Sequence, residues 1–109
     1  MDDGAHATLP APELLEAEDG FLDWEYAGPL TVRVPAYPGM RANDVVTVHW
    51  ATGLGRHDES VRVTGVWAGG ALAIRLPNRC LSSSANRISY SVARFTGGTE
   101  TSRTLIVNR

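Results

Sequence analysis

The hydrophobic period of two is the feature that most constrains how this chain can fold. Short segments alternate apolar, often β-branched residues with polar ones, and clusters of Gly, Pro, Asn or Ser separate the segments. This pattern is typical of β-strands, because successive side chains of a strand point to opposite faces of a sheet. The predicted strands are TVRV (31–34), VVTVHW (45–50), VRVTGV (61–66), ALAIRL (71–76), RISYSVARF (87–95) and TLIVN (104–108).

A further edge strand is predicted at PELLEA (12–17), although APELLEAED is also compatible with a short helix. No segment has the 10–15 residues of helical pattern that would connect parallel strands, so the sheets are expected to be antiparallel. About seven strands at this spacing favour an all-β antiparallel β-sandwich, and the single cysteine leaves it without a disulfide.

Length and composition indicate one globular domain. The chain has 109 residues, of which 43% are hydrophobic and 20% charged, values typical of a soluble domain. We expect residues 1–8 to be a disordered or linking N-terminus and residues 9–109 to form the single domain. Cys80 is the sole cysteine, which excludes an internal disulfide, and we expect it to behave as a small buried hydrophobic residue.

The charge pattern argues against nucleic acid and membrane as partners. Net charge is −2, and the ten basic residues are all Arg, spread from Arg33 to Arg109 among acidic residues. Nucleic-acid binding requires a concentrated basic surface. The sequence also lacks an apolar run of about 18 residues, so no membrane insertion is expected, and MDDGAHATLP does not have the pattern of a signal peptide.

Alternation also assigns faces to the predicted strands. In VVTVHW, Val46, Val48 and Trp50 share one face, and His49 lies on the other. In RISYSVARF, the apolar face carries Tyr90 and Val92. The residues expected to form the centre of the core are Trp50, Tyr90, Val92, Val48 and Ile74.

Trp50 on the third predicted strand and Tyr90-Ser-Val92 on the penultimate strand resemble the immunoglobulin pattern. Val92 stands at the position that is Cys in members with a disulfide. The strings LPAPELLEA, TVRVPAYPGMRANDVVTVHW and ISYSVAR resemble bacterial Ig-like repeat domains of large surface or secreted proteins of the adhesin type. The resemblance covers residues 9–108.

This resemblance implies an Ig-like antiparallel β-sandwich that serves as a non-catalytic spacer or adhesion repeat within a larger extracellular or cell-surface protein. A cytoplasmic protein is the alternative localisation. Its expected partners are neighbouring Ig-like domains of the same chain, and a host or matrix protein or a glycan. It supplies no catalytic residue, metal ligand or cofactor.

Two groups of polar residues are candidates for a metal site and for a catalytic site. His49, His57, Asp58 and Glu59 have the ligand types of a zinc site, but without a tight spacing, so the favoured interpretation is a solvated loop and no metal. A hydrolytic triad would take its nucleophile from Ser82, Ser83 or Ser84 and its other two members from His49 and Asp58. That segment has neither a nucleophile elbow nor a following helix, so no catalytic residue is predicted.

Aromatic residues outside the alternating pattern suggest an alternative function. Trp24, Tyr26 and Trp67 are not assigned to the core by strand alternation. Exposed indoles and phenols can stack on sugar rings, so a carbohydrate-binding β-sandwich with these residues as its platform is the alternative. Packing at the ends of the sandwich is the simpler explanation for the same residues.

Overall fold

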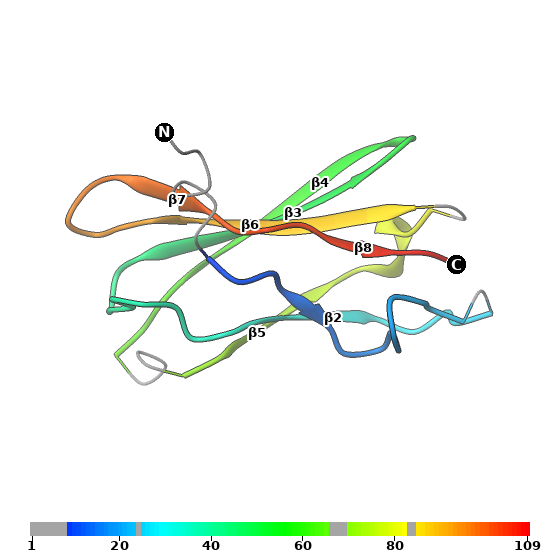
Figure 1. Cartoon of the computed structure of the whole chain (residues 1–109), viewed down its shortest axis with the longest axis horizontal. Helices are drawn as coiled ribbons and strands as arrows, with labels where there is room; N and C mark the ends of the chain where they lie inside the picture. The colour runs from blue at the N-terminus through cyan, green and yellow to red at the C-terminus, as the bar shows by residue number, and fades with distance from the viewer. Residues whose placement is uncertain (1–8, 24, 66–69, 83–84) are drawn as a thin grey trace.

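Two antiparallel β-sheets face each other across a shared core in the computed structural model (Figure 1). The structure describes residues 9–109, apart from residue 24 and the ranges 66–69 and 83–84. These residues form eight strands and no α-helix. The predicted all-β antiparallel sandwich without a disulfide is therefore confirmed.

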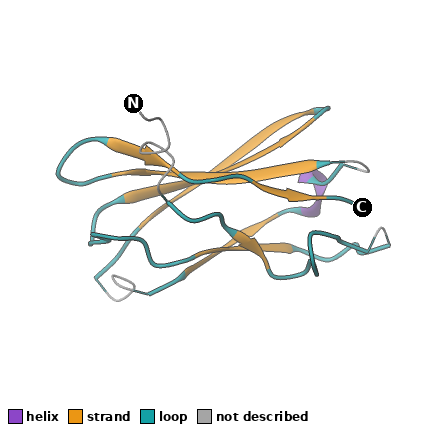
Figure 2. Ribbon diagram, viewed as in Figure 1, coloured by secondary structure: helices purple, strands orange, loops and turns teal. Residues whose placement is uncertain are grey.

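The smaller sheet has the order β1-β2-β5, with β1 (Glu13–Leu14), β2 (Leu30–Val34) and β5 (Leu72–Leu76). A short 3₁₀ helix, η2 (Asn78–Cys80), follows β5 and leads to the other sheet (Figure 2). The chain thus crosses between the two sheets after β2 and again after β5.

The larger sheet has five strands in the order β4-β3-β6, with β7 and β8 both paired to the remaining edge of β6. Figure 1 shows the β3–β4 hairpin extending away from the smaller sheet. The strands are β3 (Val45–Thr52), β4 (Gly55–Arg62), β6 (Asn86–Ala93), β7 (Thr99–Thr101) and β8 (Leu105–Val107).

The bounds of the predicted strand at 61–66 were wrong, as was the predicted loop before it, and residue 66 lies outside the described residues. β4 spans Gly55–Arg62, and the turn between β3 and β4 is the two-residue Gly53–Leu54. β4 is an edge strand with polar residues on both faces, so it lacks the apolar alternation by which strands are recognised. β7 was also missed, because the polar segment Thr99–Thr101 reads as part of a turn.

The N-terminal segment closes one side of the sandwich. β1 is shorter than the predicted strand at 12–17, and it pairs with β2 of the smaller sheet. Leu9 forms a parallel bridge with Ser102, and Phe21 forms another with Asn108. The same segment therefore makes backbone contacts with both sheets, which ties their edges together.

The space between the sheets is filled by apolar side chains from both layers. In β3 every second residue is buried, and Val46, Val48 and Trp50 are at most 1% exposed. Burying a side chain of this size contributes about 1.5–3 kcal/mol. The buried apolar residues are Leu9, Leu14, Leu22, Leu30, Val32, Val34, Tyr37, Val46, Val48, Trp50, Val63, Leu72, Ile74, Leu76, Ile88, Tyr90, Val92 and Val107.

In the part of the chain that the structure describes, no helix has the length and apolar character needed to cross a membrane.

Candidate functional site

Trp50 lies inside the sandwich and is fixed there by a hydrogen bond. Its indole Nε1 donates to Asn86 Oδ1 at 3.1 Å, and the same oxygen accepts the backbone N–H of Ser82 at 2.9 Å. All three residues are buried. The indole therefore links β3 to the start of β6. Val48, Ile74, Tyr90 and Val92, the other residues expected at the centre of the core, are also buried.

Tyr90 departs from the immunoglobulin pattern in one respect. The tyrosine of that pattern bonds back to the backbone through its hydroxyl, whereas the Tyr90 hydroxyl is buried without a hydrogen-bond partner among the described residues. Tyr90 is one of the alternating buried residues of β6, so its side chain lies in the core. Burial raises the pKa of Tyr90 to about 12.

The predicted aromatic platform cannot be assembled from the described residues. Trp24 and Trp67 lie outside them, and only Tyr26 is placed. The Tyr26 ring is partly buried against the core, and its hydroxyl donates to the Pro29 carbonyl. Its backbone carbonyl accepts a hydrogen bond from Arg109 at 3.0 Å.

The larger sheet turns its other face to solvent, and we call this surface the outer face. Cross-strand pairing arranges its side chains in rows. One row aligns Asp58, His49 and Ser89, and the next aligns Ser60, Thr47 and Ser91. The residues of β3 and β6 near the middle of this face are mostly small, because Thr, Ser and Ala predominate there.

His49 on the outer face connects a serine to an aspartate. Its Nε2 lies 2.9 Å from Ser91 Oγ, and its Nδ1 lies 3.0 Å from Asp58 Oδ1. The three residues come from three adjacent strands, and Ser91 lies 42 positions from His49 in the sequence. The order of these contacts, from serine Oγ to histidine Nε2 and from histidine Nδ1 to an aspartate oxygen, is the same as in the catalytic relay of serine hydrolases. We call it the outer-face relay.

Arg56 binds the Asp58 carboxylate of this relay. Its Nε and Nη2 each donate to Asp58 at 3.1 Å, which is a bidentate contact. These bonds from Arg56, together with the bond to His49, hold the pKa of Asp58 below its ordinary value. Asp58 is therefore ionised at neutral pH, but its charge is shared between the guanidinium and the imidazole.

The outer-face relay lacks the surroundings of a hydrolytic site. Ser91 lies within β6, between the paired strands β3 and β7, and the N–H of the neighbouring Tyr90 donates to Ser102 Oγ at 2.9 Å. A hydrolase needs free donors aimed at the developing oxyanion. The Asp58 side chain is 41% exposed, so solvent also weakens the electrostatic support that it gives to His49.

The structure brings together only pairs from the predicted catalytic and metal-binding sets, such as His49 with Asp58. Ser82 is buried, and its backbone bonds Asn86, whereas Ser83 and Ser84 lie outside the described residues. His57 lies on the opposite side of β4 from Asp58 and contacts Glu59, with Nε2 and Oε1 3.2 Å apart. Within the described residues no group of three His, Cys, Asp or Glu side chains has the arrangement of a metal site.

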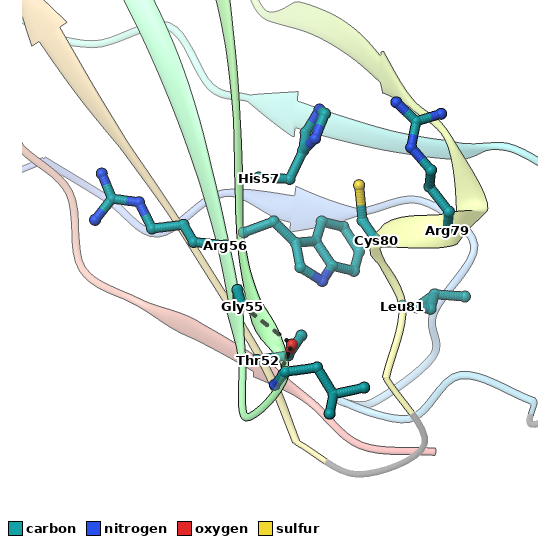
Figure 3. Close-up of a pocket in the computed structure, with 9 residues that line it drawn as sticks. Thr52, Gly55, Arg56, His57, Arg79, Cys80 and Leu81 are labelled. Carbon is teal, nitrogen blue, oxygen red and sulfur yellow. Dashed lines mark hydrogen bonds between the residues drawn. The ribbon is translucent and has the colours of Figure 1, made fainter.

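A hollow of about 270 Å³ lies between the β3–β4 hairpin and η2. Figure 3 shows Arg56 and His57 leaving β4 on opposite sides, with His57 on the side of Cys80. Burial raises the pKa of the Cys80 thiol. The thiol is consequently protonated at neutral pH and is not an activated nucleophile.

A second hollow, of about 370 Å³, lies on the outer face beside the relay. We call it the basic hollow. The row Arg56, Ala51, Arg87 and Ile106 crosses it from β4 to β8. The other residues that line it are His49, Ser89 and Thr104.

Asp44 forms a buried polar cluster at one end of the sandwich, which the sequence did not reveal. Its Oδ2 accepts the Tyr37 hydroxyl at 2.8 Å and the Arg41 backbone N–H at 3.2 Å, and its Oδ1 accepts the Phe95 N–H at 2.9 Å. Arg94 lies 3.9 Å from Oδ2, and its guanidinium stacks 4.9 Å from the centre of the Tyr37 ring.

The electrostatics of this cluster favour an ionised Asp44. Burial by itself raises the pKa of the carboxyl, but the hydrogen bonds and the charge of Arg94 together lower it below its ordinary value. Burial and the bond to Asp44 raise the pKa of Tyr37. The cluster connects the loop before β3 to the loop after β6, and we interpret it as structural.

Comparisons with models of protein families, with curated proteins and with solved structures found no match to this chain.

Proposed function

We propose that this chain is a non-catalytic interaction module, used as a spacer or adhesion repeat in a larger bacterial surface or secreted protein. The observation that carries this proposal is the outer-face relay, in which Ser91, His49 and Asp58 bond one another on an open sheet. There Ser91 lies between two paired strands, and the neighbouring Tyr90 N–H, a donor of the kind that hydrolysis would need, is engaged by Ser102 Oγ. Ionisable groups held in this way favour contact with a partner over chemistry.

The construction of the sandwich also supports a mechanical role. The apolar residues of both sheets form one continuous core, and the N-terminal segment bridges the sheet edges at Leu9 and Phe21. The loops at one end are linked through Asp44. A domain stiffened in this way is suited to setting the distance between its neighbours, which we propose to be Ig-like domains of the same protein.

The test is ester hydrolysis by the purified domain. We expect Ser91→Ala and the native chain to hydrolyse p-nitrophenyl acetate at the same rate, because no oxyanion donor assists Ser91. Thr47→Ala is the matched control, since Thr47 is the cross-strand neighbour of Ser91 on the same face. Hydrolysis that is lost in Ser91→Ala and in His49→Gln but retained in Thr47→Ala would overturn the proposal.

A further inference from the structure

We propose that the basic hollow binds an acidic saccharide, with the sugar carboxylate on Arg87 and sugar hydroxyls on Ser89 and Thr104. This inference rests on the proposed function and names the class of ligand that the module would hold. It places binding on the outer face, on residues other than the aromatic ones that the sequence suggested.

Charge is the first argument for this ligand. The chain has a net charge of −2, yet two arginines and no carboxylate line the basic hollow. Arg56 is already engaged by Asp58 through two hydrogen bonds. Arg87 is exposed and makes no ion pair with any described residue, so its guanidinium is free to take a carboxylate in a bidentate contact.

Shape and polarity give the second argument. The volume of about 370 Å³ falls within the range of small-ligand sites, roughly 300–1,000 Å³. Ala51 is the smallest residue in the row between Arg56 and Arg87, which leaves space between the two longer side chains. The hydroxyls of Ser89 and Thr104 can donate to and accept from sugar hydroxyls. The side chain of Ile106 is 46% exposed and offers an apolar surface to the C–H groups of a sugar ring.

The position of the basic hollow favours a saccharide over a peptide or a nucleic acid. An extended peptide commonly binds by pairing with the free edge of a sheet, whereas this site lies on the face of the larger sheet, with β3 and β6 at its centre. A nucleic acid requires a row of phosphate contacts. The hollow has a single unengaged arginine, which suits one carboxylate among neutral hydroxyls.

The experiment is an NMR titration of the ¹⁵N-labelled domain with a tetramer of galacturonic acid, and with the neutral tetramer of galactose as the matched ligand. We expect the acidic tetramer to shift the amide signals of Ala51, Ser89 and Thr104. Arg87→Gln should weaken binding by about tenfold, because it removes a charged bidentate contact. Arg75→Gln is the matched variant, since Arg75 is an exposed arginine of the smaller sheet, and it should bind as the native chain does.

Several outcomes would overturn the inference. The neutral tetramer could bind with the same affinity as the acidic one, or the amide shifts could lie elsewhere on the domain. Arg87→Gln could leave the affinity unchanged, or inorganic phosphate alone could saturate the same amide shifts at the same concentration. None of these affects the non-catalytic function proposed above. Cleavage of the tetramer that is lost in Ser91→Ala would instead overturn that function, whether or not the basic hollow binds the ligand.

Discussion

Asp44 and Asp58 use similar partners in opposite environments. Asp44 accepts hydrogen bonds from Tyr37 and two backbone amides, and lies near Arg94. Asp58 accepts bonds from Arg56 and contacts His49. The pKa of each carboxyl is lowered in the folded protein. However, Asp44 is 0% exposed, whereas the Asp58 side chain is 41% exposed.

Burial therefore determines which of the two polar clusters contributes more to the stability of the fold. A buried donor that loses its acceptor keeps the full cost of its desolvation. An exposed donor that loses its acceptor returns to water at little cost. The Asp44 cluster is therefore expected to be structural, and the outer-face relay is expected to be dispensable for folding.

The largest expected effect is that of Asp44→Ala. This change leaves the Tyr37 hydroxyl and the backbone amides of Arg41 and Phe95 without their acceptor inside the protein. We expect it to lower the free energy of unfolding by about 3 kcal/mol, measured by urea denaturation. A loss no greater than that of Asp58→Ala, the matched exposed carboxylate, would contradict the comparison.

The pH dependence of stability provides an independent check on Asp44. Because its pKa is lower in the folded protein than in the unfolded chain, the unfolded chain binds more protons as the pH falls. The stabilisation by the charged carboxylate is thus complete above the unfolded pKa of about 3.9, and it is lost as the pH decreases through the folded value. Asp44→Asn should remove this part of the acid-induced loss.

The next effect separates two buried tyrosines. Tyr37→Phe removes the hydroxyl that donates to Asp44, and we expect a loss of about 1.5 kcal/mol. Tyr90→Phe removes a buried hydroxyl that has no partner among the described residues, so we expect a change near zero or a slight gain in stability. Thermal unfolding of both variants under the same conditions measures the difference. Equal losses would show that hydrogen bonding does not distinguish the two sites.

The smallest effect is expected on the outer face. Asp58→Asn weakens the contacts to Arg56 and His49, all of which are partly exposed. We expect the free energy of unfolding to change by less than about 0.5 kcal/mol. Urea denaturation of this variant in low and high salt checks the prediction. A loss above about 1 kcal/mol would assign the outer-face relay a structural role as well.

The sequence predicted the buried face of each main strand but not every strand. Val46, Val48 and Trp50 alternate with more exposed residues, and the structure buries them as the pattern indicates. β4 escaped prediction because its segment, Gly55–Arg62, is polar on both faces, as an edge strand can be. The function inferred from the resemblance remains a prediction.

The sequence identified two of the three residues of the outer-face relay as candidates. His49 and Asp58 were recognised as candidate ionisable residues, but only the register of β3 and β4 shows that they lie opposite each other. Ser91 was not recognised, because its contact with His49 depends on the pairing of β3 with β6, 42 residues away. Asp44 was not recognised either, since nothing in its local sequence distinguishes a buried turn residue from a solvated one.

The sequence by itself determined the class of fold and the separation of Trp50 from His49 onto opposite faces. Alternation is a local property of an extended backbone, so each strand carries that information within its own residues. The tertiary structure alone decided which side chains meet across strands, and therefore the outer-face relay, the basic hollow and the burial of Asp44. Those contacts depend on strand register and on the stacking of two sheets, which involve residues far apart in the chain.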